Sequence, residues 1–194
     1  MPIFETKWID EKVPVFIWKT EESNLDPDVL SLGPRQREQW HGRQLLDYAA
    51  SILGLSMSKL TKDAFGKPYF ADTSWEFSLT HTKSFIAVVF HPDQPVGIDL
   101  ERPQPKIEKV LPRICTPQEI EWAAKDPIKS CFLWSAKEAM YKLYGKRSVN
   151  FKENLEVASE HQGEINMPEV HLAVRFVSYT KVIPDHVLVV ALLQ

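Results

Sequence analysis

Cysteine is scarce in this sequence. Cys115 and Cys131 are its two cysteines among 194 residues, and they have neither C-x-x-C spacing nor a neighbouring group of histidines. Both fall in segments whose pattern is typical of helices. We therefore expect two buried free thiols rather than a disulfide or a metal site, which is compatible with a reducing cytosol.

Long apolar runs and an excess of positive charge are also absent. No run approaches the ~20 residues that a membrane helix needs, and residues 1–8 lack the basic and apolar regions of a signal peptide. The net charge of −3 at pH 7 disfavours a dedicated nucleic-acid binder, which usually carries a strongly basic face. We expect a soluble, cytoplasmic protein with neither a membrane nor a nucleic acid as its partner.

Several catalytic motifs are missing as well. The sequence has no Gly-x-Ser-x-Gly elbow, no Walker loop, no Gly-x-Gly-x-x-Gly and no His-Glu-x-x-His. Nucleophilic chemistry at a serine or cysteine of this chain is therefore not expected.

The composition, with 44% hydrophobic and 25% charged residues, is that of an ordinary globular protein. Both halves follow the order strand, helix, then strands, which predicts an α+β fold of two similar lobes, residues 1–94 and 95–194, with a boundary near Pro95. The expected strands are 13–18, 75–80, 84–90, 96–101, 155–158, 170–177 and 186–193; the expected helices cover 34–53, begin at Thr116-Pro117, and run from Asp126-Pro127 to Gly145.

Two acids alternate with apolar residues in the segment 96–101. In a strand, Asp99 and Glu101 project to one face while their neighbours fill a core on the other. Gly97 leaves the face beside the acids open. Two adjacent carboxylates repel each other, and oxygen-only ligation suits Mg²⁺. The alternative is an exposed strand face with two solvated acids beside Arg102.

A third acid, Glu138, lies in the helical segment 134–142. Glu138 and Lys142 are four residues apart, a spacing that commonly forms an exposed ion pair worth ~0.3–0.5 kcal/mol. The helix has almost no polar face, however. We therefore expect Lys137, Glu138 and Lys142 to enter a partly enclosed site, where charges are kept when they are paired or bound to a metal or phosphate.

Three smaller features could contact a phosphate. Thr80 and His81 lie at a hairpin tip beside Lys83, Lys67 lies in a Gly-Lys-Pro loop, and Arg43 lies on an amphipathic helix. Hydroxyl, imidazole and cationic groups all donate to phosphate oxygens. Taken singly, each is also an ordinary surface residue.

Read in order, these motifs resemble those of the 4′-phosphopantetheinyl transferases of the Sfp type. The resemblance covers roughly residues 40–145 and rests on Gly42-Arg43, Gly66-Lys67-Pro68, Phe77-Ser-Leu-Thr-His81, Val96-Gly-Ile-Asp-Leu-Glu101 and Trp134-Ser-Ala-Lys-Glu-Ala-Met-Tyr-Lys142. It implies a monomer whose two similar lobes form a pseudo-dimer, with coenzyme A bound between them. The nucleotide-side contacts are expected in the N-terminal lobe, and the metal-binding acids and catalytic helix in the C-terminal lobe.

The resemblance also implies roles for individual residues. Glu138 and Lys142 would be catalytic, with Glu138 accepting the proton of the attacking serine. Asp99, Glu101 and Glu138 match the ligands of Mg²⁺, with Mn²⁺ as an alternative ion, and Lys142 matches the lysine that contacts the coenzyme A pyrophosphate. Thr80 and His81 match the pair near the 3′-phosphate. Arg43 and Lys67 match basic positions around the nucleotide.

The implied reaction transfers phosphopantetheine from coenzyme A to a serine of an apo acyl or peptidyl carrier protein and releases adenosine 3′,5′-bisphosphate. The chain departs from the family pattern at Thr80, usually a serine, and at 145–149, which lacks a second glycine and a leucine. Four bases could still receive an acidic carrier helix, namely Lys142, Lys146, Arg147 and Lys152. The alternatives are a Mg²⁺-dependent phosphohydrolase of coenzyme A or a nucleotide, and a non-catalytic module that binds carrier or coenzyme A.

Overall fold

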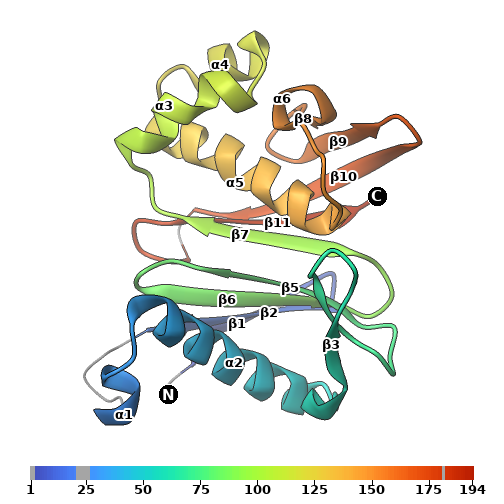
Figure 1. Cartoon of the computed structure of the whole chain (residues 1–194). Coiled ribbons are helices and arrows are strands. Elements are labelled where there is room, and N and C mark those ends of the chain that lie inside the picture. The colour runs from blue at the N-terminus through green and yellow to red at the C-terminus, as the bar shows by residue number, and fades with distance from the viewer. Residues whose placement is uncertain (1–2, 21–26, 181) are drawn as a thin grey trace. The chain divides into compact units, whose positions relative to one another are not determined.

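A computed structural model describes residues 3–20, 27–180 and 182–194. The chain divides into two compact units, Met1–Asp93 and Gln94–Gln194. Each unit combines helices with an antiparallel sheet (Figure 1). The α+β class expected from the sequence is confirmed, whereas the pseudo-dimeric arrangement stays a prediction.

The N-terminal unit is built on a sheet with the strand order β1-β2-β6-β5. Neighbouring strands in it are antiparallel, and a short hairpin of β3 and β4 forms a separate ribbon. The elements are β1 (Ile3–Ile9), β2 (Val13–Lys19), α1 (Pro27–Leu30), α2 (Pro34–Ile52), the 3₁₀ turn η2 (Met57–Lys59), β3 (Leu60–Lys62), β4 (Pro68–Phe70), β5 (Glu76–His81) and β6 (Phe85–His91).

Helix α2 packs against this sheet. It starts with Pro34 in its first turn and ends just before Gly54, whose φ is +71°, as the sequence predicts. Its buried side chains share one core with β2, β5 and β6, including Phe16, Leu45, Leu46, Ala49, Ala50, Phe77 and Phe90.

The C-terminal unit has a sheet with the order β7-β11-β10-β9-β8. The first strand of the unit therefore pairs with its last, with Asp99 opposite Val189. The elements are β7 (Val96–Glu101), α3 (Pro105–Ile114), α4 (Pro117–Ala123), α5 (Pro127–Tyr144), α6 (Phe151–Asn154), β8 (Leu155–Val157), β9 (Gln162–Met167), β10 (Val170–Tyr179) and β11 (Val187–Leu193).

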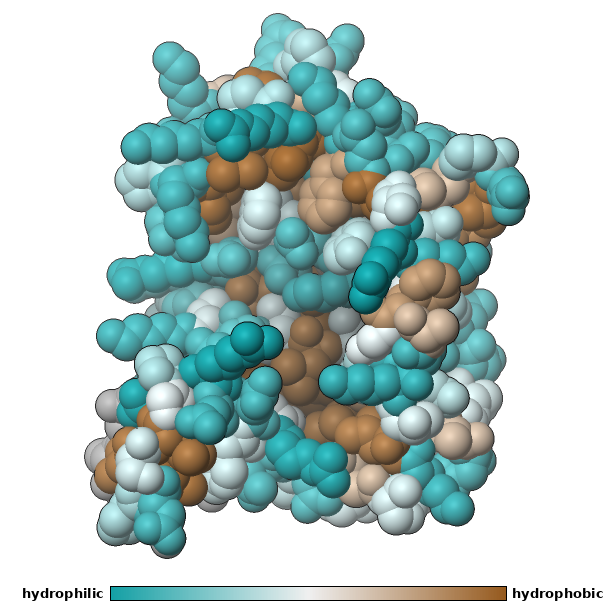
Figure 2. Space-filling model, viewed as in Figure 1, coloured by the Kyte–Doolittle hydropathy of each residue, from teal (hydrophilic) through white to brown (hydrophobic). Residues whose placement is uncertain are grey.

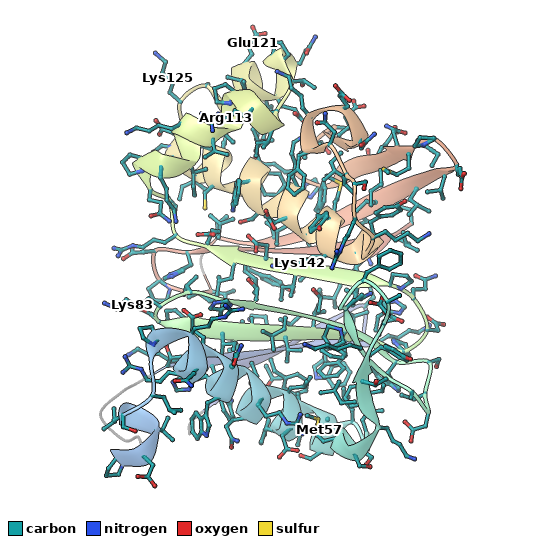
Figure 3. All side chains as sticks on the ribbon, in the orientation of Figure 1. Met57, Lys83, Arg113, Glu121, Lys125 and Lys142 are labelled. Atoms are coloured by element: carbon teal, nitrogen blue, oxygen red, sulfur yellow. The ribbon has the colours of Figure 1, made fainter. Side chains whose placement is uncertain are left out.

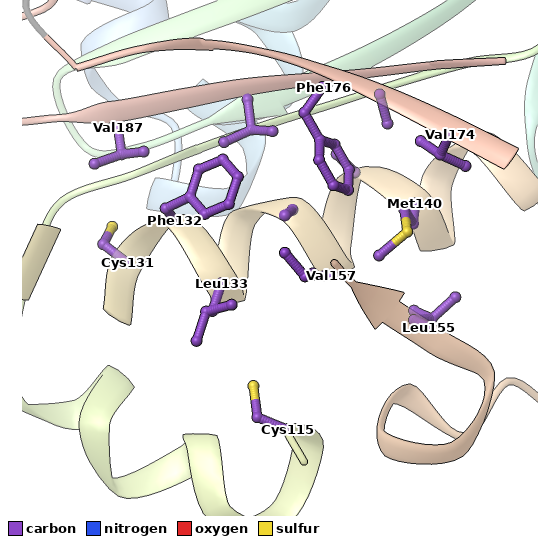
Figure 4. Close-up of a cluster of buried hydrophobic side chains, with 14 of the residues drawn as sticks. Cys115, Cys131, Phe132, Leu133, Met140, Leu155, Val157, Val174, Phe176 and Val187 are labelled. Carbon is purple, nitrogen blue, oxygen red and sulfur yellow. The ribbon is translucent and has the colours of Figure 1, made fainter. Parts of the chain in front are cut away.

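Helix α5 carries the main core of this unit. Apolar side chains on it, such as Phe132 and Met140, pack against Val174 and Phe176 of β10 (Figure 4). Cys115 and Cys131 lie in the same core as buried free thiols, as expected. Cys131 belongs to α5, but Cys115 follows the last residue of α3 and is therefore not helical.

The predicted helix ends are confirmed. Thr116 forms a capping box with Glu119 at the start of α4, and Asp126 caps α5 through the backbone N–H groups of Ile128 and Lys129. Gly145 ends α5 in the left-handed conformation, with φ of 69°. These local signals fix where the helix that carries Glu138 begins and ends.

Several elements were not expected from the sequence. Strand β1, the β3–β4 hairpin, β9 and helix α3 are absent from the sequence prediction. The Gly-Lys-Pro stretch around Lys67 was expected to be a loop, yet its proline is the first residue of β4. Helix α3 begins at Pro105, a position that a helix tolerates, but it also contains Pro112, and a proline inside a segment usually indicates the end of a helix.

The surface of the described residues is mixed in character. On the face drawn in Figure 2, hydrophilic residues predominate and apolar residues gather in separate patches. Within the described ranges, no helix has both the length and the apolar character needed to cross a membrane.

Candidate active site

The acid-bearing face of β7 lies directly against helix α5. A Cβ atom added at Gly97 would lie 1.8 Å from the carbonyl oxygen of Ala139 and 2.8 Å from the amide nitrogen of Leu143. The expectation that Gly97 leaves this face open is therefore wrong, because the helix backbone fills that space. Gly97 instead permits a close approach that sets Asp99 and Glu101 beside the helix carrying Glu138.

Lys142 links the helix to the acid strand. Its Nζ donates to Oδ1 of Asp99 at 2.8 Å and to the carbonyl oxygen of Ile98 at 2.9 Å. The Lys142 side chain is 27% exposed, whereas that of Asp99 is 7% exposed. Figure 3 shows Lys142 near the end of α5 and next to β7. The cation thus neutralises the more buried acid while part of it remains open to solvent.

The two glutamates of the site have raised pKa values. Burial is the main cause of the raised pKa of Glu138, followed by repulsion from Asp99, while Lys142 opposes the shift. Burial and then the charge of Asp99 also raise the pKa of Glu101, against the lowering effects of Lys106 and a hydrogen bond from Trp134. The three carboxylates therefore lie within electrostatic range of one another.

The donor set of these acids fits a hard divalent cation. Three carboxylates supply only oxygen, which suits Mg²⁺ or Mn²⁺, and a cation would relieve the repulsion that contributes to the raised pKa values of Glu101 and Glu138. Within the described residues, however, no three side chains of His, Cys, Asp or Glu converge closely enough to hold a metal ion. The ligand assignment of Asp99, Glu101 and Glu138 stays a prediction.

Lys137 does not enter this site, contrary to expectation. Its side chain is fully buried, and its Nζ lies 2.9 Å from Oε1 of Glu119. The helix turns Lys137 away from Glu138 and Lys142 because the three residues do not share a helical face.

In the N-terminal unit, Arg43 and His81 line one cavity of about 430 Å³. Arg35 and Lys62 also line this cavity, as does the carboxylate-bearing Glu38. His81 Nε2 lies 3.1 Å from Oε2 of Glu38. The structure thus brings together two of the four residues predicted for the nucleotide side.

The other two predicted residues are placed differently. Lys67 Nζ donates to Oε2 of Glu76 at 2.8 Å, and Lys67 is not among the residues that line the cavity. Thr80 is 4% exposed in β5 and likewise does not line it. Their roles stay predictions.

A second cavity, of about 300 Å³, lies beside the first in the same unit. Arg37, His41 and Lys83 line it together with Glu38 and His81, which are shared by both cavities. Sequence reasoning missed Arg35, Arg37 and His41. Helical spacing offered a signal, because Pro34, Arg37 and His41 recur at intervals of three and four residues and so share a face of α2.

Two comparisons with known proteins bear on this chain. Residues 95–190 match the model of a family described as the 4′-phosphopantetheinyl transferase superfamily. A stretch covering 53% of the chain is also 28% identical, over 110 residues, to a protein of Haemophilus influenzae provisionally named 4′-phosphopantetheinyl transferase. The alignment spans 46% of that relative's length.

Proposed function

Because residues 95–190 belong to the 4′-phosphopantetheinyl transferase superfamily, we propose that the protein transfers the phosphopantetheine arm of coenzyme A to a serine of an apo carrier protein. One observation carries the proposal. Within the matched residues, Lys142 joins α5 to Asp99 on β7 beside the carboxylates of Glu101 and Glu138. A cation among three acids suits a pyrophosphate substrate bound with a divalent metal.

The proposed reaction forms one P–O bond and breaks another. The serine hydroxyl of the carrier attacks the β-phosphorus of coenzyme A, and the bond from that phosphorus to the bridging oxygen breaks. Adenosine 3′,5′-bisphosphate leaves with the bridging oxygen. Asp99, Glu101 and Glu138 would hold Mg²⁺ or Mn²⁺, which when bound supplies positive charge to the pyrophosphate oxygens.

Glu138 is the proposed acceptor of the serine proton. Burial and nearby acids raise the pKa of Glu138, and a raised pKa makes a carboxylate a stronger base when it is ionised. The position of Glu138 on α5, among the acids that favour a metal-bound phosphate, supports this role.

Lys142 is proposed to stabilise the leaving pyrophosphate oxygens. An ammonium group has three N–H donors, and two of those on Lys142 are directed at Asp99 and the Ile98 carbonyl. The third can donate to a phosphate oxygen without breaking either contact. A preorganised donor of this kind stabilises charge as it develops in the transition state.

The cationic cavities of the N-terminal unit support binding of the nucleotide part of coenzyme A. Arg43 and His81, together with Arg35 and Lys62, surround the larger cavity, and these groups suit phosphate oxygens. We propose that Thr80 and Lys67 contribute through local adjustment, since Lys67 first has to leave Glu76.

The enzyme subtype, the oligomeric state, the location and the carrier are also proposals. We propose an Sfp-type enzyme that works as a monomer in the cytoplasm and accepts an acyl or peptidyl carrier. Bases after α5 are available for an acidic carrier helix, since Lys146 and Arg147 are exposed. Lys152, in contrast, has its Nζ 3.2 Å from the carbonyl oxygen of Pro112.

The direct test incubates the protein with coenzyme A, Mg²⁺ and a panel of apo acyl and peptidyl carriers. Mass spectrometry is expected to detect one phosphopantetheine on at least one carrier, with no transfer in excess chelator. Asp99→Ala and Glu138→Ala are expected to abolish loading, while Lys109→Ala, an exposed change on α3, leaves it intact.

Three results would contradict the proposal. The first is a panel of carriers that a reference transferase loads but this protein does not. Release of free phosphopantetheine without a carrier would instead identify a phosphohydrolase. Tight binding of coenzyme A in calorimetry, with no turnover, would identify a non-catalytic module.

A further inference from the structure

Lys137 lies inside the C-terminal unit with no exposed surface. Its Nζ lies 2.9 Å from Oε1 of Glu119, and it donates to the carbonyl oxygens of Phe151, at 3.1 Å, and Leu155. These three oxygens match the three N–H groups of an ammonium. Lys137 therefore does not reach a substrate phosphate while these contacts hold.

Glu119 connects this lysine to two further segments. Its Oε2 accepts a hydrogen bond from the N–H of Thr116 at 2.7 Å, and its Oε1 accepts one from the N–H of Val157 at 2.9 Å. The carboxylate is 3% exposed. One buried carboxylate thus joins the start of α4, the middle of α5 and strand β8.

Helix α5 is held from a second direction by Lys142. Lys137 and Lys142 are five residues apart, so their side chains leave the helix about 140° apart. Lys137 attaches the helix to α4, α6 and β8, whereas Lys142 attaches it to β7. Two attachments in different directions prevent the helix from rotating about its axis. Glu138 is the residue after Lys137, so the direction of the Glu138 side chain depends on the contacts of Lys137.

Stability alone is a weak reason for this buried ion pair. The loss of hydration of two buried charges can exceed their attraction, and apolar residues of similar size are often equally stabilising. An apolar pair would pack in this core, but it would not fix the helix rotation through directed hydrogen bonds.

We propose that Lys137 is a positioning residue whose ion pair with Glu119 fixes the rotation of α5 and thereby directs Glu138 toward Asp99 and Glu101. The inference rests on the proposed function, because that function makes the direction of Glu138 matter. The two lysines of the same helix then differ in role: Lys142 contacts substrate, and Lys137 supports the acid.

The test compares Lys137→Met with the double variant Lys137→Met/Glu119→Gln. Lys137→Met leaves a buried carboxylate without its cation, so the thermal midpoint is expected to fall. Glutamine removes the buried charge but keeps only one of the two oxygens that accept from the N–H groups of Thr116 and Val157, so the double variant is expected to regain part of that loss. Lys109→Met is the matched control, because Lys109 is exposed on α3.

The decisive readout is the affinity for Mn²⁺, measured by electron paramagnetic resonance on the full chain. The double variant is expected to bind Mn²⁺ about tenfold more weakly than wild type, as is typical when a group supporting a metal ligand is lost. Its kcat for transfer is expected to fall about as much, with the KM for coenzyme A unchanged within about threefold. Glu119→Gln alone, which nearly preserves side-chain size, is expected to show the same loss if the double variant does not fold.

Wild-type Mn²⁺ affinity in folded Glu119→Gln or in the folded double variant would overturn the inference. Absence of Mn²⁺ binding by wild type would overturn it as well, since Glu138 would then have no metal to be directed at. If wild type binds Mn²⁺ but loads no carrier, the proposed function fails, and the Mn²⁺ affinities of the variants still decide the role of Lys137.

Discussion

Lys142 Nζ lies 2.8 Å from Oδ1 of Asp99, so the helix and the strand of the candidate site are joined by a contact between their own functional groups. The same ammonium donates to the carbonyl oxygen of Ile98. The position of this cation is therefore set by β7 before any substrate binds. A group held in place in this way does not need to reorganise as charge develops on a leaving phosphate.

Lys142→Ala is expected to lower kcat for phosphopantetheine transfer by about 10²-fold or more. It is also expected to lower the free energy of unfolding by about 1–3 kcal/mol, because nearly buried Asp99 loses a charged donor. Steady-state kinetics and urea unfolding measure the two effects. The exposed change Lys109→Ala should alter neither, and a Lys142→Ala enzyme within about twofold of wild-type kcat would refute the assigned role.

Gly97→Ala is expected to lower the free energy of unfolding by about 3 kcal/mol or more. The new methyl group would overlap the Ala139 carbonyl oxygen, and helix backbone cannot move aside as a flexible side chain can. Gly33→Ala is the matched control, since its Cβ would meet only Gln36 Oε1, at 3.6 Å. Equal chemical denaturation curves for the two variants would show that α5 does not pack on β7 so closely.

In chelating buffer, Glu138 is expected to make the protein less stable as the pH rises above its ordinary carboxyl value of 4.5. The pKa of Glu138 is raised in the folded state, so the native protein holds more protons than the unfolded chain. The contribution is favourable below pH 4.5 and is lost as the pH passes through the raised pKa. Glu138→Gln should therefore gain stability relative to wild type between pH 4.5 and neutrality. Urea unfolding across this range measures the difference, and a constant difference would contradict the raised pKa.

Neither cysteine is expected to react with iodoacetamide at pH 8 while the protein is folded. Burial is the largest cause that raises the pKa of Cys115 and of Cys131, each to about 12, and the thiolate is the reactive form. Intact-mass measurement should find no adduct in the native protein and two adducts after denaturation. Rapid native alkylation of either thiol would show that its core opens readily.

Local signals predicted the helix ends but not the packing partners. Thr116, Asp126 and Gly145 specify helix ends through contacts with nearby residues, and the structure confirms all three. The alternation in 96–101 likewise predicted that Asp99 and Glu101 share a face. The presence of α5 on that face depends on contacts between residues far apart in sequence, which no short pattern encodes.

The two lysines of α5 illustrate the same limit for the site. The sequence predicts that both Lys137 and Lys142 enter it, because the surrounding helix is almost wholly apolar. Only the fold reveals that Lys137 faces Glu119, whose carboxylate also completes the capping box at the start of α4. Arg37 and His41 were missed for a related reason, since their cavity depends on how α2 meets the β5–β6 turn.

The pairing of β7 with β11 has a consequence for synthesis of the chain. Val96–Glu101 receive their sheet partners, Val187–Leu192, only after roughly ninety more residues have been added. Until then, β7 lacks its paired strand in the sheet. The backbone hydrogen bonds that hold Asp99 in position for its contact with Lys142 are therefore missing. The emerging chain therefore contains all the acids of the site well before it can assemble them, and a nascent chain interrupted before β11 would carry the whole motif without a working centre.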